Sequence, residues 1–292
     1  LADIAAKYVA LDDLAGLKGF LREDPKLSKE LIPYAAALGS VNSLELFLAL
    51  NDLSWNATFP PSLDLPLATL VSYSEETVEP LYAFALLSGN LAALKAIGDK
   101  GADLARTFSY VVYKEMGDSD FHEDNALRAA ARLAPGSGMA EYALAKGVDP
   151  NTAGRDGRSP LMLAIISGDQ PLVNVLLKAK ANPNYANEDS LVPLHFASAF
   201  GRIEAVSALL AVGANPILQD RHGFTALHYA ADARSLEITR LLVAKAPALA
   251  LAKTTTFVFL DETYGEALPA GSTALDLAKL LLAREEHESE RV

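Results

Sequence analysis

The chain has 292 residues, 51% of them hydrophobic and 21% charged, which is the composition of a globular protein rather than a disordered one. Its 25 Lys and Arg against 37 Asp and Glu give a net charge of −12, which argues against nucleic acid and anionic membrane surfaces as partners. Cys is absent, which excludes disulfides, thiol nucleophiles and zinc–thiolate sites, and no apolar run is long enough for a membrane-spanning helix.

The first half of the chain carries apolar residues at the spacing of short amphipathic helices. Residues 1–29 predict a degenerate N-terminal cap, with Leu14, Leu17, Phe20 and Leu21 on one face. Each of the next three units has two apolar segments joined by a turn, which predicts a helix pair. These units cover residues 30–58, 77–106 and 122–151.

The second half repeats itself at a period of 33 residues. Three gapless copies open at Ser159-Pro160-Leu161, Val192-Pro193-Leu194 and Thr225-Ala226-Leu227. Each copy continues into a second apolar segment, so helix pairs are expected at 156–188, 189–221 and 222–250. A last unit, at 271–292, ends in a charged run that suits a solvent-facing cap.

These units are expected to stack into one structure. Gly201 and Gly213 stand where the two helices of one repeat must end, because left-handed helix caps favour glycine. One short helix pair cannot bury its own apolar face, whereas stacked pairs can. We therefore expect residues 1–292 to form a single domain with one continuous core.

The repeated segments resemble the ankyrin repeat, with its T-P-L-H-x-A opening, its V-x-L-L second segment and its polar turn. The resemblance implies an all-α ankyrin-repeat solenoid of about eight helix pairs that binds a folded protein across its concave face, without catalysis. It also implies that His195 and His228, 33 residues apart, bond the backbone of a neighbouring turn rather than a metal.

Three inserts interrupt the repeat. The segment around 254–265 is rich in β-forming residues and predicts a hairpin finger. A second aromatic insert covers residues 107–118, and a third, with three prolines, runs from Trp55 to Glu79 and predicts an ordered but irregular loop. Because the repeat does not require these residues, exposed aromatics among them are candidate interface anchors.

Nine aromatic residues are candidates for partner binding, either from the inserts or from the first helices of the late repeats. They are Phe108, Tyr110, Tyr113, Phe196, Phe200, Tyr229, Phe257, Phe259 and Tyr264. The alternative is that the inserts pack their aromatics onto the stack. For Phe196, Phe200 and Tyr229, packing and partner contact are equally open.

No catalytic, cofactor or metal site is predicted. His122-Glu123 and His287-Glu288 lack the second His that a zinc helix needs four residues on, and no phosphate-binding glycine loop is present. An enzyme is therefore a remote alternative.

The Ala- and Leu-rich, Cys-free chain is also similar to exported bacterial ankyrin proteins, some of which protect their cell by capping an enzyme such as a cell-wall peptidase. This similarity implies an inhibitor of a partner enzyme and favours an exported or periplasmic location over a cytoplasmic one. The net charge of −12 suits a basic partner enzyme. Because the chain starts at Leu1, a processed N terminus is expected. A monomer, no nucleic acid and no membrane insertion are expected, and a cytosolic adaptor or a secreted effector remains the alternative.

Overall fold

A computed structural model describes residues 9–23, 31–38, 40–51, 53–54, 58–59, 71–72, 79–113, 119–254, 258–261 and 266–276. The chain divides into two compact units, residues 1–156 (unit 1) and residues 157–292 (unit 2). The expectation of one domain over 1–292 stays a prediction.

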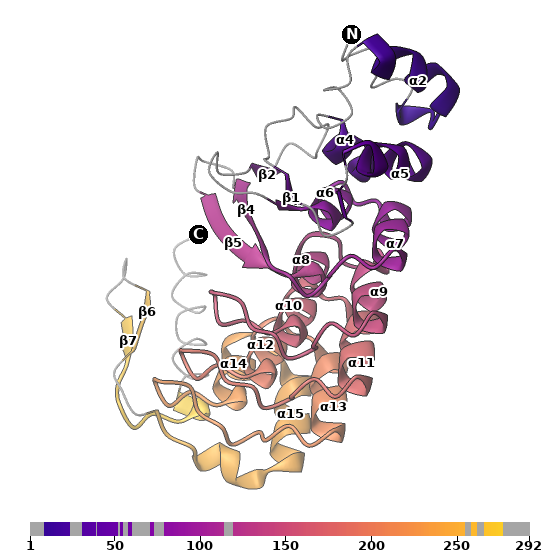
Figure 1. The fold of residues 1–292 in the computed structure, drawn as a ribbon. Helices are drawn as coiled ribbons and strands as arrows, with labels where there is room; N and C mark the ends of the chain where they lie inside the picture. Colours follow the sequence, from indigo (N-terminus) through magenta and orange to yellow (C-terminus); the bar gives the residue numbers. More distant parts are fainter. Residues whose placement is uncertain are drawn as a thin grey trace, which may run out of the picture. The chain divides into compact units, whose positions relative to one another are not determined.

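Unit 1 is built from helix pairs in which successive first helices pack on one another and successive second helices do the same (Figure 1). The helices are α2 (Leu14–Glu23), α4 (Ile32–Leu38), α5 (Val41–Leu50), α6 (Leu81–Leu87), α7 (Leu91–Asp99), α8 (Ala126–Leu133) and α9 (Met139–Ala145).

Short strands lie between the helix pairs of unit 1. They are β1 (Thr58–Phe59), β2 (Val71–Ser72), β3 (Glu79–Pro80), β4 (Phe108–Tyr113) and β5 (Ser119–Asp124). β1 pairs with β3, and β2, β4 and β5 form an antiparallel sheet in that order. The insert at 107–118 therefore contributes to a β-hairpin, while most of the 55–79 insert, including Trp55, lies outside the described residues.

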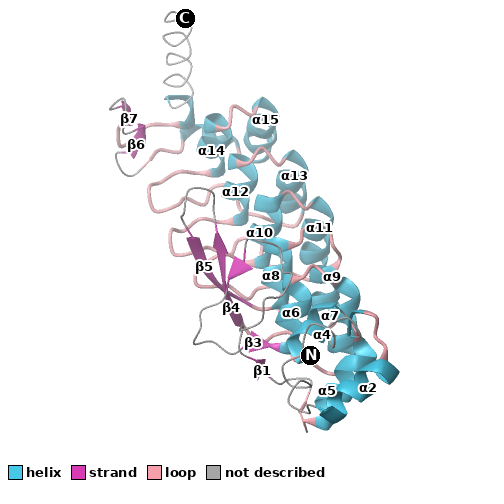
Figure 2. Cartoon of the chain, turned by 90° about the horizontal axis from the view of Figure 1, so that it is seen from above, coloured by secondary structure: helices cyan, strands magenta, loops and turns pink. Residues whose placement is uncertain are grey.

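Unit 2 has three complete helix pairs, with α10, α12 and α14 in one layer and α11, α13 and α15 in the other (Figure 2). The helices are α10 (Pro160–Ser167), α11 (Gln170–Lys178), α12 (Pro193–Ala199), α13 (Ile203–Ala211), α14 (Ala226–Asp232) and α15 (Leu236–Lys245). A 3-10 helix, η1 (Pro247–Leu251), and the antiparallel strands β6 (Val258–Asp261) and β7 (Glu266–Leu268) follow. The hairpin expected from the late insert is present.

The 33-residue register is visible in the core of unit 2. Leu161, Leu194 and Leu227 occupy equivalent positions and are at most 4% exposed. The equivalent alanines Ala164, Ala197 and Ala230 are fully buried, and their small side chains suit close packing of the first helices. Together with the three pairs of unit 1, the described residues contain six complete helix pairs. The expected all-helical repeat fold is confirmed, and the first and last units lie partly outside the described residues.

Two glycines end helices as expected. Gly201 follows α12 with a φ of 64°, and Gly213 follows α13 with a φ of 91°. A residue with a Cβ is strained in this left-handed region, so glycine terminates each helix at little conformational cost.

His195 and His228 order the starts of α12 and α14. The Nδ1 of His195 accepts a hydrogen bond from the Val192 backbone N–H at 3.2 Å, and its Nε2 lies 3.0 Å from the carbonyl oxygen of Leu218 in the next inter-repeat loop. The Nδ1 of His228 accepts from the Thr225 backbone N–H at 3.1 Å. Both rings are 1% exposed, and burial lowers the pKa of both imidazoles. His195 thus makes the expected bond to the backbone of a neighbouring turn, whereas the hydrogen bond described for His228 is to its own N-cap residue, Thr225.

We predict that Leu194→Ala and Leu227→Ala each lower the free energy of unfolding by about 2–5 kcal/mol, because each truncation leaves a cavity in the stacked core. Leu251→Ala is the matched control, since Leu251 is 78% exposed and should tolerate the change. Urea unfolding followed by circular dichroism measures all three, and an unchanged midpoint in either core variant would contradict the repeat register.

We also predict that unit 2 loses stability as the pH falls below about 6.5, the pKa of an unperturbed His. His195 and His228 bind a proton at a higher pH in the unfolded chain than in the folded one, because burial lowers their pKa values in the folded state. The loss of stability therefore begins near pH 6.5 and grows until the pH reaches the lowered pKa values of the folded state. NMR titration of the imidazole C–H signals tests this in the native protein and in urea. Native titration of His195 and His228 at or above 6.5 would refute it.

Candidate protein-binding surface

The β4–β5 hairpin is an inserted element of unit 1 whose attachment the structure describes in detail. Its six-residue strands pair in continuous register, from Phe108 opposite Asp124 to Tyr113 opposite Ser119. β4 also pairs with β2, so the hairpin belongs to a three-stranded sheet in which β4 is the central strand. The hairpin ends at Asp124, one residue before the N-cap of α8.

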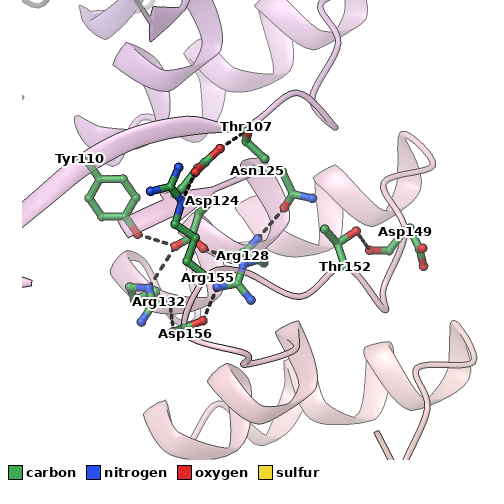
Figure 3. A network of polar contacts seen from close by, with 11 residues as sticks. Thr107, Tyr110, Asp124, Asn125, Arg128, Arg132, Asp149, Thr152, Arg155 and Asp156 are labelled. Carbon is green, nitrogen blue, oxygen red and sulfur yellow. Dashed lines mark hydrogen bonds and ion pairs between the residues drawn. The ribbon is translucent and has the colours of Figure 1, made fainter. Parts of the chain in front are cut away.

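A buried charge cluster fixes the base of this hairpin (Figure 3). Asp124 is fully buried and accepts hydrogen bonds from Arg128 Nε at 2.6 Å and Arg132 Nε at 3.0 Å. Since these residues are spaced by four, α8 presents both guanidinium groups on the side that the end of β5 reaches.

Asp156 closes the cluster from the loop after α9. Its two carboxylate oxygens accept from Arg128 Nη2 at 2.9 Å and from Arg132 Nη2 at 2.8 Å. A Cβ at Gly154 would collide with the Arg128 guanidinium, so the loop requires glycine there. Two cations and two anions thus balance, which offsets the desolvation cost of burying Arg128 at 1% exposure.

Tyr110 joins the cluster from β4. It is fully buried, and its hydroxyl donates to Asp124 Oδ2 at 2.7 Å. Burial, with the adjacent Asp124 carboxylate, raises the pKa of Tyr110. Phe108, 3% exposed, stacks on Tyr110 and meets Tyr82 edge to face. Phe108 and Tyr110 therefore pack within unit 1, which was one of the two alternatives for this insert. Neither is the exposed anchor that the sequence suggested, because both side chains are buried at the base of the hairpin.

The remaining insert aromatics are placed only in part. Tyr113 ends β4 and Phe259 lies in β6, but their side chains lie outside the described part of the structure. Phe257 and Tyr264 lie outside the described residues altogether. Their assignment as partner-binding residues stays a prediction.

In unit 2, Phe196 on α12 and Tyr229 on α14 occupy equivalent positions on neighbouring first helices, and both are half-buried. The guanidinium of Arg158 lies 6.0 Å from the centre of the Phe196 ring, which is a cation–π contact. The Tyr229 hydroxyl donates to Asp220 Oδ2 at 2.8 Å, and burial raises its pKa. Each ring therefore has intramolecular partners and still retains exposed surface.

Asp220 also orders the loop before α14. Its Oδ1 accepts from the backbone N–H groups of His222 at 2.9 Å and Phe224 at 2.8 Å. Arg221 in turn pairs with Asp189 of the preceding inter-repeat loop at 2.6 Å. These bonds hold two neighbouring loops of unit 2 together beside the first helices.

Phe200 differs from Phe196 and Tyr229. It is the C-cap residue of α12, next to the turn into α13, and is 50% exposed. It therefore lies at the end of unit 2 where the first and second helices of each pair are joined, and not at the end that carries the inter-repeat loops.

Sequence reasoning missed the charge cluster. Its available signal was the Asp124, Arg128, Arg132 spacing, in which two arginines interrupt an otherwise Ala- and Leu-rich helix. The contribution of Asp156 had no such signal, because it depends on how the loop after α9 folds back onto α8.

The described residues contain no group of three or more His, Asp or Glu arranged to hold a metal ion. Within the same residues, no helix combines the length and the apolar character needed to cross a membrane.

We predict that Asp124→Ala lowers the free energy of unfolding by about 3–5 kcal/mol, because it removes one of the two carboxylates shared by the buried Arg128 and the partly buried Arg132. Lys100→Ala is the control in the same unit: its pair with Glu45 is about half exposed and should contribute little. Thermal and urea unfolding measure both variants. Equal stability of the two would show that the cluster does not hold the hairpin.

Comparison with known proteins supports the repeat assignment. Residues 179–252 match the family model for ankyrin repeats in three copies, and residues 156–188 match the model for the single ankyrin repeat. No curated protein matches the chain. Ankyrin repeats are generally modules for protein interaction rather than catalysis. Residues 156–252 are therefore assigned to the ankyrin-repeat family.

Proposed function

We propose that this chain binds one folded, basic protein through the first helices of its repeats and through its inserted hairpins. The proposed partner is an enzyme, which the chain inhibits by binding to it. The proposed mode is the self-protection type suggested by the sequence, in which a non-catalytic module caps an enzyme such as a cell-wall peptidase. The expected partner-facing residues with described side chains are Phe196 and Tyr229, and the hairpin residues Tyr113, Phe257, Phe259 and Tyr264 supply the remaining candidates.

The observation that carries this proposal is the buried anchoring of the β4–β5 hairpin. A helix pair does not need a hairpin in order to stack, yet unit 1 uses Asp124, Arg128, Arg132 and Asp156 to fix one. Holding an insert in one conformation before binding reduces the entropy lost on association. A fixed, projecting hairpin therefore supports recognition of a partner groove rather than a solely structural role.

The charge of the chain supports a basic partner. A net charge of −12 accelerates encounter with a positively charged protein, and the acceleration weakens as salt screens it. An adaptor or effector would bind a partner without abolishing its activity. Enzyme activity measured during titration therefore distinguishes the two functions.

The proposal is tested with the immobilised chain and a lysate of its source organism, washed at low and then at high salt, with the bound proteins identified by mass spectrometry. The purified partner is then titrated with the chain in an activity assay. We expect a basic enzyme whose activity falls to zero at one equivalent of a monomeric chain. Full activity of the saturated complex would refute inhibition and favour the adaptor.

We predict that replacing residues 255–268 with a short Gly-Ser turn weakens partner binding at least tenfold, about 1.4 kcal/mol, while melting stays near normal. The replacement keeps Thr254, which is 3% exposed and whose backbone pairs with Ser272 and Gly271 at the hairpin base. Calorimetry measures folding and binding separately. Unchanged binding would indicate that the partner contacts the first helices of the repeats instead. A variant that fails to fold would indicate that the hairpin packs on the repeats.

A further inference from the structure

Unit 2 contains an open pocket at the ends of its helices where first and second helices are joined. Its volume is about 520 Å³, and its lining includes Gly168, Gln170, Arg202, Ile203, Glu204 and Glu237. Because the helices of each pair are antiparallel, this end is opposite the one that carries the inter-repeat loops. The pocket is thus separate from the surface proposed above.

Arg202 occupies a position that its neighbours use for helix capping. Asp169 and Ser235 stand 33 residues before and after it, and each accepts a hydrogen bond from the backbone N–H three residues on. Arg202 has no acceptor and gives α13 no side-chain cap. The loss of a side-chain cap lowers the stability of a helix, so helix capping does not explain why Arg occupies position 202.

The fold supplies no full set of partners for this guanidinium. Arg202 Nε is buried without a hydrogen-bond partner, and Nη2 makes only a long contact, 3.4 Å, with the Ile166 carbonyl oxygen. The group lies over Gly168, where a Cβ would stand 2.9 Å from its Cζ. Among the described ion pairs, none joins Arg202 to Glu204 or Glu237, although both glutamates line the pocket. This contrasts with Arg128, whose guanidinium is bound by two carboxylates.

Two exposed apolar residues lie close in sequence to residues of the pocket, although neither lines the pocket itself. Phe200, two residues before Arg202, is 50% exposed, and Leu236, next to Glu237, is 63% exposed. Exposed large apolar residues around an arginine are typical of protein interfaces, where arginine and aromatic residues contribute most binding energy.

We propose that the Arg202 pocket receives a loop of a partner protein that carries an Asp or Glu beside an apolar residue and a Lys or Arg. The carboxylate pairs with Arg202, and the arginine geometry suits a two-point contact with it. The apolar side chain lies against Phe200 or Leu236, and the basic side chain meets Glu204 and Glu237. The pocket residues therefore form a second contact surface, which does not depend on the hairpins.

The test is an NMR titration of the full chain with N-acetyl-Asp-Leu-Lys-amide, followed through the Arg202 Nε–H signal. N-acetyl-Asn-Leu-Lys-amide is the matched neutral-side-chain probe. We expect the Asp peptide to shift this signal and to bind at least tenfold more tightly than the Asn peptide. Tighter binding of the Asn peptide would show that the two glutamates dominate and would overturn the proposal, as would the absence of any shift.

The variant Arg202→Ser separates binding from folding, because Ser at this position can cap α13 as Ser235 caps α15. We expect it to melt at a higher temperature than the wild type and to bind the Asp peptide at least tenfold more weakly. Arg240→Ala, which removes an exposed arginine of α15 outside the pocket, should leave peptide binding unchanged. A lower melting temperature for Arg202→Ser, or unchanged peptide binding, would assign Arg202 a structural role and overturn the proposal.

Discussion

The structure depends on the inability of one short helix pair to bury its own apolar residues. Helices of seven to ten residues, such as α12 and α15, are too short to be stable alone in water. Each gains stability when its apolar face contacts the equivalent face of the next repeat, which is why Leu194 and Leu209 are almost fully buried. Elements that do not serve this stacking must be held by other interactions.

The β4–β5 hairpin illustrates how such an element is held. Among its described side chains, Phe108 and Tyr110 are buried, and a charge cluster completes the attachment of the hairpin. Buried charges are costly unless every partner is in place, and here Asp124 and Asp156 serve both arginines. The same requirement restricts the hairpin base to one conformation, so attachment and rigidity have a common cause.

The contrast between repeats and inserts explains how far sequence analysis reached. The positions of Leu161, Leu194 and Leu227 were predictable because the 33-residue period states which residues are equivalent, and equivalence implies burial. The late hairpin was predictable from its β-forming composition. The burial of Tyr110 was not, because it depends on Asp124 and on two arginines of α8. An aromatic residue in an insert has no repeat equivalent from which its burial can be inferred, and the pattern alone leaves packing and binding indistinguishable.

Two arginines show how the repeat register can separate structural from functional residues. Arg128 breaks an apolar helix pattern, and the fold accounts for it through Asp124 and Asp156. Arg202 breaks a capping pattern established by Asp169 and Ser235, and the fold leaves its Nε without a partner. When a residue breaks the local sequence pattern and the fold supplies its bonding partners, the residue has a structural role. When the fold leaves such a residue without partners, a functional role is expected. In a repeat protein this comparison is internal, because neighbouring repeats supply the reference for each position.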